Sequence, residues 1–273
     1  MIILITGAFG FVGKEVRNNL LEHKHTVITL GIESENDLVC DLRNEISSLD
    51  FVDIVIHIAG KAHSNPKSPS EKELFFEINF QGTKNLCDAL DKIQKPKSFI
   101  FISTVAVYGV ISGLNISEDH PLNGHSPYAL SKIQAEEYLQ DWCEKNNVKL
   151  GILRPSLIAG KNPPGNLGAM INGIKSGKYL RIGKSSARKS ILMAEDVARL
   201  IPKLVEVGGV YNVCDNHHPS FAELEETISK QLNKKLPISI PLWVAKFLGI
   251  VGDIIPRNLA THNGIEMGSF NTI

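Results

Sequence analysis

Apolar runs alternate with amphipathic stretches along the first two thirds of the chain. The apolar runs have the length of buried strands, and they cover residues 2–5, 25–30, 51–60, 97–109 and 149–160. The stretches between them have the apolar periodicity of helices, at residues 13–25, 71–93 and 127–146. Strands that alternate with helices are typical of a doubly wound parallel sheet, an α/β fold whose ligands bind beyond the carboxyl ends of the strands.

The pattern loosens after about residue 160, where Gly, Pro, Lys and Ser become frequent. We therefore expect a dinucleotide-binding domain at residues 1–160, to which a later segment near 190–215 returns. We expect the remainder, residues 161–273, to be mainly a smaller substrate-binding region.

An apolar stretch at residues 240–255 is the one candidate for membrane contact. It carries Lys246 and Asp253, which interrupt it too strongly for a spanning helix. The pattern favours a C-terminal helix packed on the body of the protein, and an interfacial or substrate-covering helix is the alternative.

Composition and charge narrow the class of protein. Of the 273 residues 43% are hydrophobic, enough for a sizeable core, and 29 basic residues balance 29 acidic ones. Balanced charge gives no electrostatic reason to expect a nucleic-acid partner. The four cysteines contain no C-x-x-C pair, so we expect reduced thiols and no metal site. The first strand begins at residue 2, which leaves no room for a signal peptide and predicts a cytoplasmic protein.

The chain opens with three glycines, Gly7, Gly10 and Gly13, directly after the first apolar run. A glycine triplet alone is weak evidence, but here a strand precedes it and a helix follows it. Unpaired amides and the positive end of a helix make such a turn an anion site, and only glycines let a pyrophosphate come so close. The alternative is a plain strand-turn-helix unit with packing glycines.

A second constellation lies where a strand ends and a helix begins. Ser103 and Thr104 lie within the run at 97–109, where we expect its strand to end. Tyr128 and Lys132 lie at the start of the helix at 127–146. Side chains at i and i+4 share a helix face, so the ammonium can lie beside the phenol. We expect this cation to pull the phenol's pKa toward neutrality, as a general acid/base requires, and Thr104 to orient the substrate oxygen.

Taken together in this order, the motifs resemble the extended short-chain dehydrogenase/reductases, in their NAD-dependent epimerase/dehydratase branch. The resemblance covers residues 1 to about 230 and rests on TGAFGFVG, CDLRN, VIHIAG, EINFQGTKNL, SPYALSK and ILRPSLIAG. It implies hydride chemistry on a nucleotide sugar with Thr104, Tyr128 and Lys132 as catalytic residues. The cofactor-binding positions that it implies are Gly7, Phe9, Gly10, Phe11, Val12, Gly13, Asp41, Leu42, Ile58, Ala59, Gly60, Asn79, Tyr128, Lys132 and Pro155.

Within that branch, the residues after Thr104 narrow the chemistry. Dehydratases of the family carry an acidic pair there, whereas this chain has Val105 and Ala106, so dehydration is not expected. The segment HIAGKAH is similar to a subgroup that includes 4-keto-reductases and related epimerases of UDP-sugars. Lys61 and His63 fall within it as substrate contacts, although His63 is equally a loop histidine with a structural hydrogen bond.

Three further positions are expected to contact the substrate's diphosphate. Asn166 lies in GNLGAM, a segment that resembles the family's diphosphate contact. In ARKSILMAEDVA, alignment places Lys189 where the family has arginine, with Arg188 one residue earlier. Either could pair with the diphosphate, but lysine lacks the planar bidentate fork, and a solvated basic loop is the alternative.

The cofactor fingerprint departs from its usual pattern at the end of the second strand. An acid normally holds the adenosine ribose there, and this chain has Gly31, with Glu33 or Glu35 as possible substitutes from the loop. No basic residue lies between Lys24 and Arg43, so we favour NAD, with NADP as the alternative.

The expected function is therefore an NAD(P)-dependent 4-keto-reductase or epimerase of a UDP-sugar. Gly31 argues for a loosely held, exchangeable cofactor and favours the reductase. The alternative is a catalytically silent dinucleotide-binding scaffold or sensor. The C-terminal region is short compared with the family, so the sugar pocket is either open or completed by a partner chain, for example in a homodimer.

Overall fold

The computed structural model describes residues 1–241, 243 and 244, which form parts of two compact units. The first unit comprises Met1–Gly109, Ser117–Lys161 and Leu192–Cys214, and the second comprises Val110–Ile116, Asn162–Ile191 and the described residues from Asp215 onward. Most of the stretch at 240–255, including Lys246 and Asp253, lies outside the described residues. In the described part of the chain, no helix is long and apolar enough to cross a membrane.

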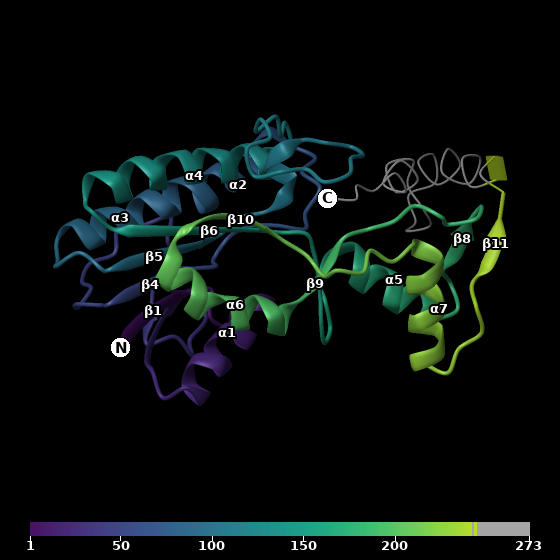
Figure 1. Ribbon diagram of the computed structural model, residues 1–273, viewed down its shortest axis with the longest axis horizontal. Helices are drawn as coiled ribbons and strands as arrows, with labels where there is room; N and C mark the ends of the chain where they lie inside the picture. Colours follow the sequence, from purple (N-terminus) through teal and green to yellow (C-terminus); the bar gives the residue numbers. More distant parts are fainter. Residues whose placement is uncertain (242, 245–273) are drawn as a thin grey trace. The chain divides into compact units, whose positions relative to one another are not determined.

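A seven-stranded parallel sheet forms the centre of the first unit (Figure 1). Its strand order is β10-β6-β5-β4-β1-β2-β3, which reverses direction next to β1, so the switch point of a doubly wound sheet lies between β1 and β4. The strands are β1 (Ile2–Thr6), β2 (Thr26–Gly31), β3 (Leu38–Val39), β4 (Ile54–His57), β5 (Ser98–Ile102), β6 (Lys149–Pro155) and β10 (Gly209–Val213). The predicted doubly wound fold is thus confirmed.

Helices cover both faces of this sheet (Figure 1). On one face lie α2 (Pro69–Phe76), α3 (Gly82–Asp91) and α4 (Pro127–Lys145), and on the other lie α1 (Phe11–Glu22) and α6 (Ala194–Val207). Each face has its own apolar cluster. Leu90 and Trp142 belong to the cluster under α3 and α4, and Val16 and Val197 belong to the cluster under α1 and α6. Buried strands need no polar face, which explains their uninterrupted apolar runs.

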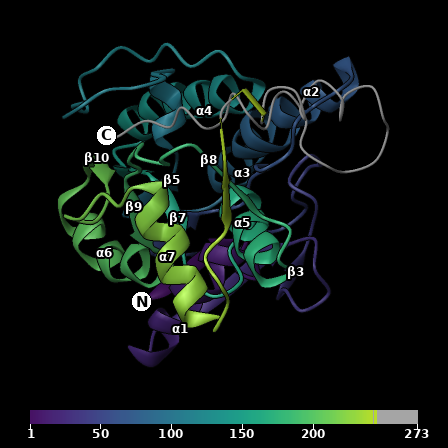
Figure 2. The same ribbon diagram turned by 90° about the vertical axis from the view of Figure 1, so that its right-hand side faces the viewer.

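The second unit is built from α5 (Gly165–Lys175), α7 (Phe221–Gln231) and a two-stranded parallel ribbon of β8 (Leu180–Ile182) and β11 (Ile238–Ile240). Helix α5 packs against α7 (Figure 2). A buried carboxylate, Glu225 on α7, accepts hydrogen bonds from Arg181 on β8 and from Tyr179, and so ties the ribbon to the helix. Ser220 and Glu223 form the capping box that starts α7.

The structure divides two of the elements that the sequence presents as continuous. The run at 149–160 breaks at Ser156 into β6 and a short strand, β7 (Leu157–Ala159), which pairs with β9 (Ile191–Met193) rather than with the main sheet. The helix at 71–93 contains a π-helical turn at Glu77–Gln81 between α2 and α3. Such turns often mark functional positions, and this one carries Asn79.

Candidate active site

The glycine turn between β1 and α1 has the geometry of an anion cradle. Gly7 has a left-handed φ of 70°, and a Cβ there would lie 2.8 Å from the backbone of Ala59. A Cβ on Gly13 would lie 2.0 Å from the carbonyl oxygen of Gly7. No side chain caps the start of α1 at Gly10, so its first amides are left for a ligand. These residues fit the pyrophosphate of a dinucleotide.

A buried chain of hydrogen bonds joins the carboxyl ends of β1 and β4 to α3. Thr6 Oγ1 lies 2.6 Å from His57 Nδ1, and His57 Nε2 lies 2.9 Å from Thr83 Oγ1. Thr83 in turn donates to the carbonyl of Asn79 at 2.6 Å, so its oxygen accepts from Nε2 and the histidine donates there. Burial and the charge of Lys132 lower the pKa of His57 to about 3, which keeps the ring neutral. This series of hydrogen bonds therefore positions Asn79, and its neutral imidazole adds no charge.

Asn79 holds the loop that follows β4. Its side-chain oxygen accepts from the Lys61 amide at 2.6 Å, and its side-chain nitrogen donates to the Lys61 carbonyl and to Ser131 Oγ on α4. A Cβ on Gly60 would lie 3.0 Å from this oxygen and 3.3 Å from Lys132 Nζ. Asn79, Gly60 and Lys132 thus meet at one point, and Ser131 is a member of the site that sequence reasoning missed.

Tyr128 and Thr104 both lie near the carboxyl end of β5. Thr104 follows β5, and its hydroxyl accepts from the Ala106 amide at the start of a 3₁₀ turn. Tyr128 lies in the first turn of α4, which Ser126 caps. The Thr104 side chain lies close enough to the Tyr128 phenol to lower its pKa. The two hydroxyls therefore form a pair at the carboxyl end of the sheet, where a substrate oxygen would be bound.

The electrostatics of this pair differ from the expectation of a phenol titrating near neutral pH. Burial raises the pKa of Tyr128, and the interaction with the Thr104 side chain lowers it by less. The Lys132 ammonium is engaged by other groups. Its Nζ donates a hydrogen bond to the Ile102 carbonyl at 2.9 Å and lies 4.4 Å from the centre of the Phe101 ring. Its own pKa is lowered by burial to about 8. Tyr128 and Lys132 lie one helical turn apart on α4, but this spacing does not by itself make an acidic phenol.

Behind Lys132 lies a buried ion pair that sequence reasoning also missed. Arg154 on β6 donates to Glu136 on α4 at 2.6 Å and to the Tyr108 hydroxyl at 2.8 Å. Glu136 is fully buried, Arg154 is 3% exposed, and the charge of Glu136 raises the pKa of Lys132. The available signal was the i+4 spacing of Lys132 and Glu136, which places both on one face of α4.

We predict that Glu136→Gln destabilises the protein by about 3–5 kcal/mol, because it leaves the Arg154 guanidinium buried without its counter-charge. Urea unfolding of the variant checks this. Glu137→Gln, at the exposed neighbouring position on the same helix, is the matched control and should leave the midpoint nearly unchanged. Equal midpoints for the two variants would show that the pair is not structural.

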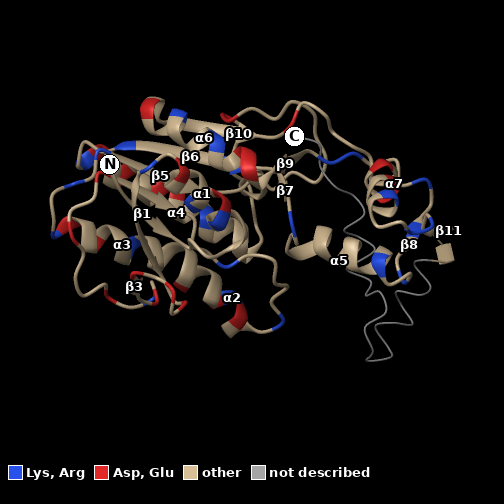
Figure 3. Ribbon diagram, turned by 90° about the horizontal axis from the view of Figure 1, so that it is seen from below, with Lys and Arg blue, Asp and Glu red and all other residues tan. Residues whose placement is uncertain are grey.

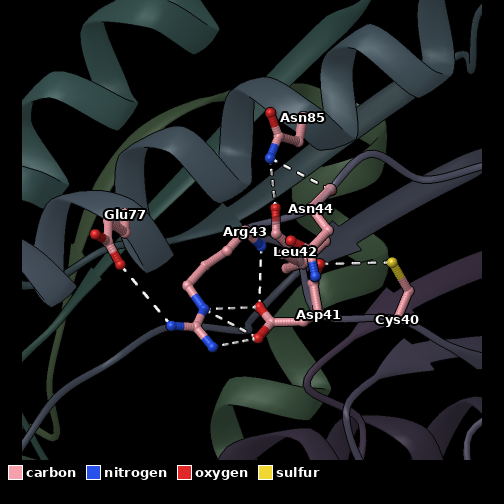
Figure 4. Close-up of polar contacts among 7 residues, drawn as sticks. All are labelled: Cys40, Asp41, Leu42, Arg43, Asn44, Glu77 and Asn85. Carbon is pink, nitrogen blue, oxygen red and sulfur yellow. Dashed lines mark hydrogen bonds and ion pairs between the residues drawn. The ribbon is translucent and has the colours of Figure 1, made fainter.

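The segment expected to contact adenine is already organised by its own ion pair (Figure 4). Arg43 donates to both carboxylate oxygens of Asp41, the shorter bond being 2.6 Å, and lies 3.8 Å from Glu77. The hydrogen bond from Arg43 holds the pKa of Asp41 below its usual value. Leu42 is buried, and its carbonyl accepts from Asn85 on α3 at 2.7 Å. Both residues remain candidates for the adenine contact.

The other expected cofactor residues lie at or near the carboxyl ends of strands or in the turn itself. The Ala59 amide donates a hydrogen bond to Thr6 Oγ1. A Cβ on Gly160 would lie 3.1 Å from the Phe11 ring, and Arg17 lies over the Phe9 ring. Three more pack in or beside the apolar core: Val12 and Ile58 are partly buried, and Pro155 is buried at the end of β6.

The expected substrate residues are divided between the two units. In the first, Lys61 Nζ lies 5.3 Å from the centre of the Phe75 ring, which itself contacts the Tyr128 ring, and His63 is exposed with φ 56°. In the second, Asn166 lies exposed in the first turn of α5, and Lys189 lies beside Arg188, before β9. Figure 3 shows further Lys and Arg positions, coloured blue on the ribbon, on α5 and around β8.

Arg188 and Lys189 have different surroundings within the second unit. Arg188 donates to the His218 carbonyl at 2.7 Å and lies 3.5 Å from the carboxylate of Glu223. Burial lowers the pKa of Lys189. Arg188 therefore holds the loop before α7, and the Lys189 side chain is half-buried.

The fold and the site together define a dinucleotide-dependent enzyme of the doubly wound α/β class. Residues 3–214 match the NAD dependent epimerase/dehydratase family, and the chain belongs to it. The family recognised from the motifs is thereby confirmed, and the comparisons give no support for the silent scaffold.

Relatives with assigned activities cover nearly the whole chain. The N-acetyl-alpha-D-glucosaminyl-diphospho-ditrans,octacis-undecaprenol 4-epimerase of Escherichia coli O157:H7 is 30% identical in an alignment of 269 positions that covers 93% of this chain and 80% of that protein. The UDP-glucose 4-epimerase of Vibrio cholerae is 27% identical over 95% of this chain and 85% of its own length. The structure of UDP-glucose 4-epimerase from Thermus thermophilus in complex with NAD shares the fold, with a TM-score of 0.74 and 24% identity, over 88% of this chain and 86% of that one.

Proposed function

We propose that this protein is an NAD-dependent 4-epimerase of a UDP-sugar. The observation that carries the proposal is that Tyr128, Thr104 and the buried Lys132 lie at the carboxyl end of a doubly wound sheet that also has a glycine cradle. When bound in that cradle, NAD supplies the acceptor and then the donor of a hydride at the sugar's C4. Both relatives described above are 4-epimerases by name, which supports the same reaction here.

Each polar residue of the first unit has a distinct role in this proposal. Tyr128 Oη takes the proton from the sugar's 4-hydroxyl and returns it, and the Thr104 hydroxyl orients that oxygen. Lys132 binds a ribose hydroxyl of the cofactor and keeps positive charge near the reacting centre. Asn79 is a positioning residue, because it fixes the Gly60–Lys61 loop and, through Ser131, the first turns of α4.

The proposal is tested with purified protein, NAD and two kinds of substrate. UDP-glucose or UDP-N-acetylglucosamine should be converted to its C4 epimer, detected by NMR, without net change in the nicotinamide absorbance. If only a polyprenyl-diphosphate-linked sugar were converted, the proposed 4-epimerisation would stand, but the substrate would be that sugar and not a UDP-sugar. Stoichiometric consumption of NADH with a 4-keto sugar, and no epimerisation, would establish the reductase instead.

We predict that Lys189→Ala raises the KM for the substrate by roughly tenfold or more, because the substitution removes a half-buried positive charge that we expect to bind the substrate's diphosphate. Arg188→Ala, at the adjacent position, is the matched control and should change KM less, since its guanidinium is held by His218 and Glu223. Steady-state kinetics on both variants check this, and the larger effect at Arg188 would reverse the assignment. Because the pKa of Lys189 is lowered, its contribution should also be lost as pH rises, at lower pH than for an ordinary lysine.

A further inference from the structure

The end of β2 holds a carboxylate, although its last residue is Gly31. A Cβ on Gly31 would lie 3.0 Å from Glu33 Oε2 and 2.9 Å from Asn36 Nδ2. The Glu33 carboxylate therefore occupies the space that the side chain of residue 31 would enter. In dinucleotide-binding folds an acid at this strand end bonds the adenosine ribose hydroxyls. Gly31 does not leave the position empty, because it makes room for an acid from two residues further on.

Asn36 fixes this arrangement. Its side-chain nitrogen donates to Glu33 Oε2 at 3.1 Å and to the Glu33 carbonyl at 2.9 Å, and its amide donates to the same carbonyl at 3.1 Å. Asn36 is only 6% exposed, and its Oδ1 is a buried acceptor that has no hydrogen-bond partner within the described residues. Such an acceptor normally has a partner, and a ligand hydroxyl is a suitable one.

The end of β2 also lies next to the cofactor cradle. The Gly7 amide donates to the carbonyl of Leu30, the residue before Gly31, at 3.2 Å. The first glycine of the cradle and the last residues of β2 are thus joined directly. A dinucleotide whose pyrophosphate lies over the glycines extends its adenosine toward this strand end.

The other charged residues of this region are engaged elsewhere. Asp37 accepts from the amide and hydroxyl of Thr29, and Glu35 accepts from the Ser34 hydroxyl. Arg43, the nearest downstream candidate for a 2′-phosphate, is bound bidentately by Asp41. The sequence alone left Glu33 and Glu35 as equal alternatives, and the contacts separate them.

We propose that Glu33, held by Asn36 over the side-chain-free Gly31, binds the adenosine ribose hydroxyls of NAD and excludes the 2′-phosphate of NADP. The carboxylate accepts hydrogen bonds from ribose hydroxyls, and the same negative charge repels a phosphate at that position. This selectivity concerns the cofactor alone, so it is measurable without any sugar substrate.

Calorimetric titration of Glu33→Gln with NAD and NADP tests the proposal. We expect NAD to bind at least about tenfold more weakly, because charge-assisted hydrogen bonds are lost. NADP should bind as well as before or better, so the NAD-to-NADP preference falls. Glu35→Gln, in the same loop, is the matched control and should keep the wild-type preference. Gly31→Ala should act like Glu33→Gln, since its methyl group would displace Glu33 and Asn36.

An NAD analogue that lacks the adenosine 2′-hydroxyl provides a second readout. Wild-type protein should bind it clearly more weakly than NAD, whereas Glu33→Gln should discriminate little between the two. An unchanged preference in Glu33→Gln, or undiminished discrimination against the analogue, would overturn the assignment. Neither outcome bears on 4-epimerisation, which is tested with the wild-type protein and UDP-sugars. Far-UV circular dichroism of each variant establishes that it is folded.

Discussion

Tyr128→Phe is expected to lower kcat by roughly 10²- to 10⁴-fold, the usual contribution of a positioned acid/base. The substitution removes one oxygen from a side chain whose ring also packs near Phe75, so the local structure should persist. NAD affinity should remain within a few-fold of the wild-type value, because the cradle and Glu33 are untouched. Turnover assays and calorimetry on the same preparation measure the two effects separately.

Tyr138→Phe is the control, because it makes the same change further along α4, where the ring packs near Phe80. It should keep near wild-type turnover. Because burial raises the pKa of Tyr128, we also expect wild-type kcat to increase with pH above neutrality, as the phenolate becomes available. Near-normal turnover in Tyr128→Phe would remove this residue from the proton transfer.

Local patterns in the sequence predicted the elements that build the site. The glycine turn and the i, i+4 pair of Tyr128 and Lys132 are set by residues adjacent in the chain or one helical turn apart. The fold follows from the same local patterns, because alternating buried strands and amphipathic helices have few stable arrangements. The structure and the family comparison confirm the fold and the family, whereas the roles of the site residues stay predictions.

What the sequence left open depends on contacts between distant segments. The Arg154–Glu136 pair joins β6 to α4, and Asn79 reaches both the Lys61 backbone and Ser131. The pKa of Tyr128 depends on burial and on where the Lys132 ammonium points, and spacing alone does not determine either. Gly31 is the clearest example. Its missing side chain suggests weak cofactor binding from the sequence, whereas in the structure the Glu33 carboxylate lies where that side chain would be. That removes the main argument for an exchangeable cofactor and hence for a reductase.

Lys132→Met is expected to change activity and stability in opposite directions. Lys132 is 3% exposed, and burial lowers its pKa from 10.5 to about 8. Below pH 8 the folded protein therefore contains a buried ammonium that is easier to protonate in the unfolded chain. A methionine of similar shape should stabilise the fold at pH 7 by about 1–3 kcal/mol, less than the full shift implies because the bond to the Ile102 carbonyl is lost. Turnover should fall by orders of magnitude.

The pH dependence of the free energy of unfolding tests independently whether Lys132→Met stabilises the protein. The unfolded chain binds more protons than the folded one between pH 8 and about 10.5, so wild-type stability gains relative to the variant across that interval. The advantage of Lys132→Met should thus be full at pH 7 and small near pH 10.5, as measured by urea unfolding at both. Lys92→Met, at an exposed lysine paired with Glu45, should show no such trend. A Lys132→Met protein less stable than wild type at pH 7 would mean that Glu136 and the Ile102 carbonyl stabilise the ammonium more than burial destabilises it. The site would then have been selected for stability as well as for catalysis.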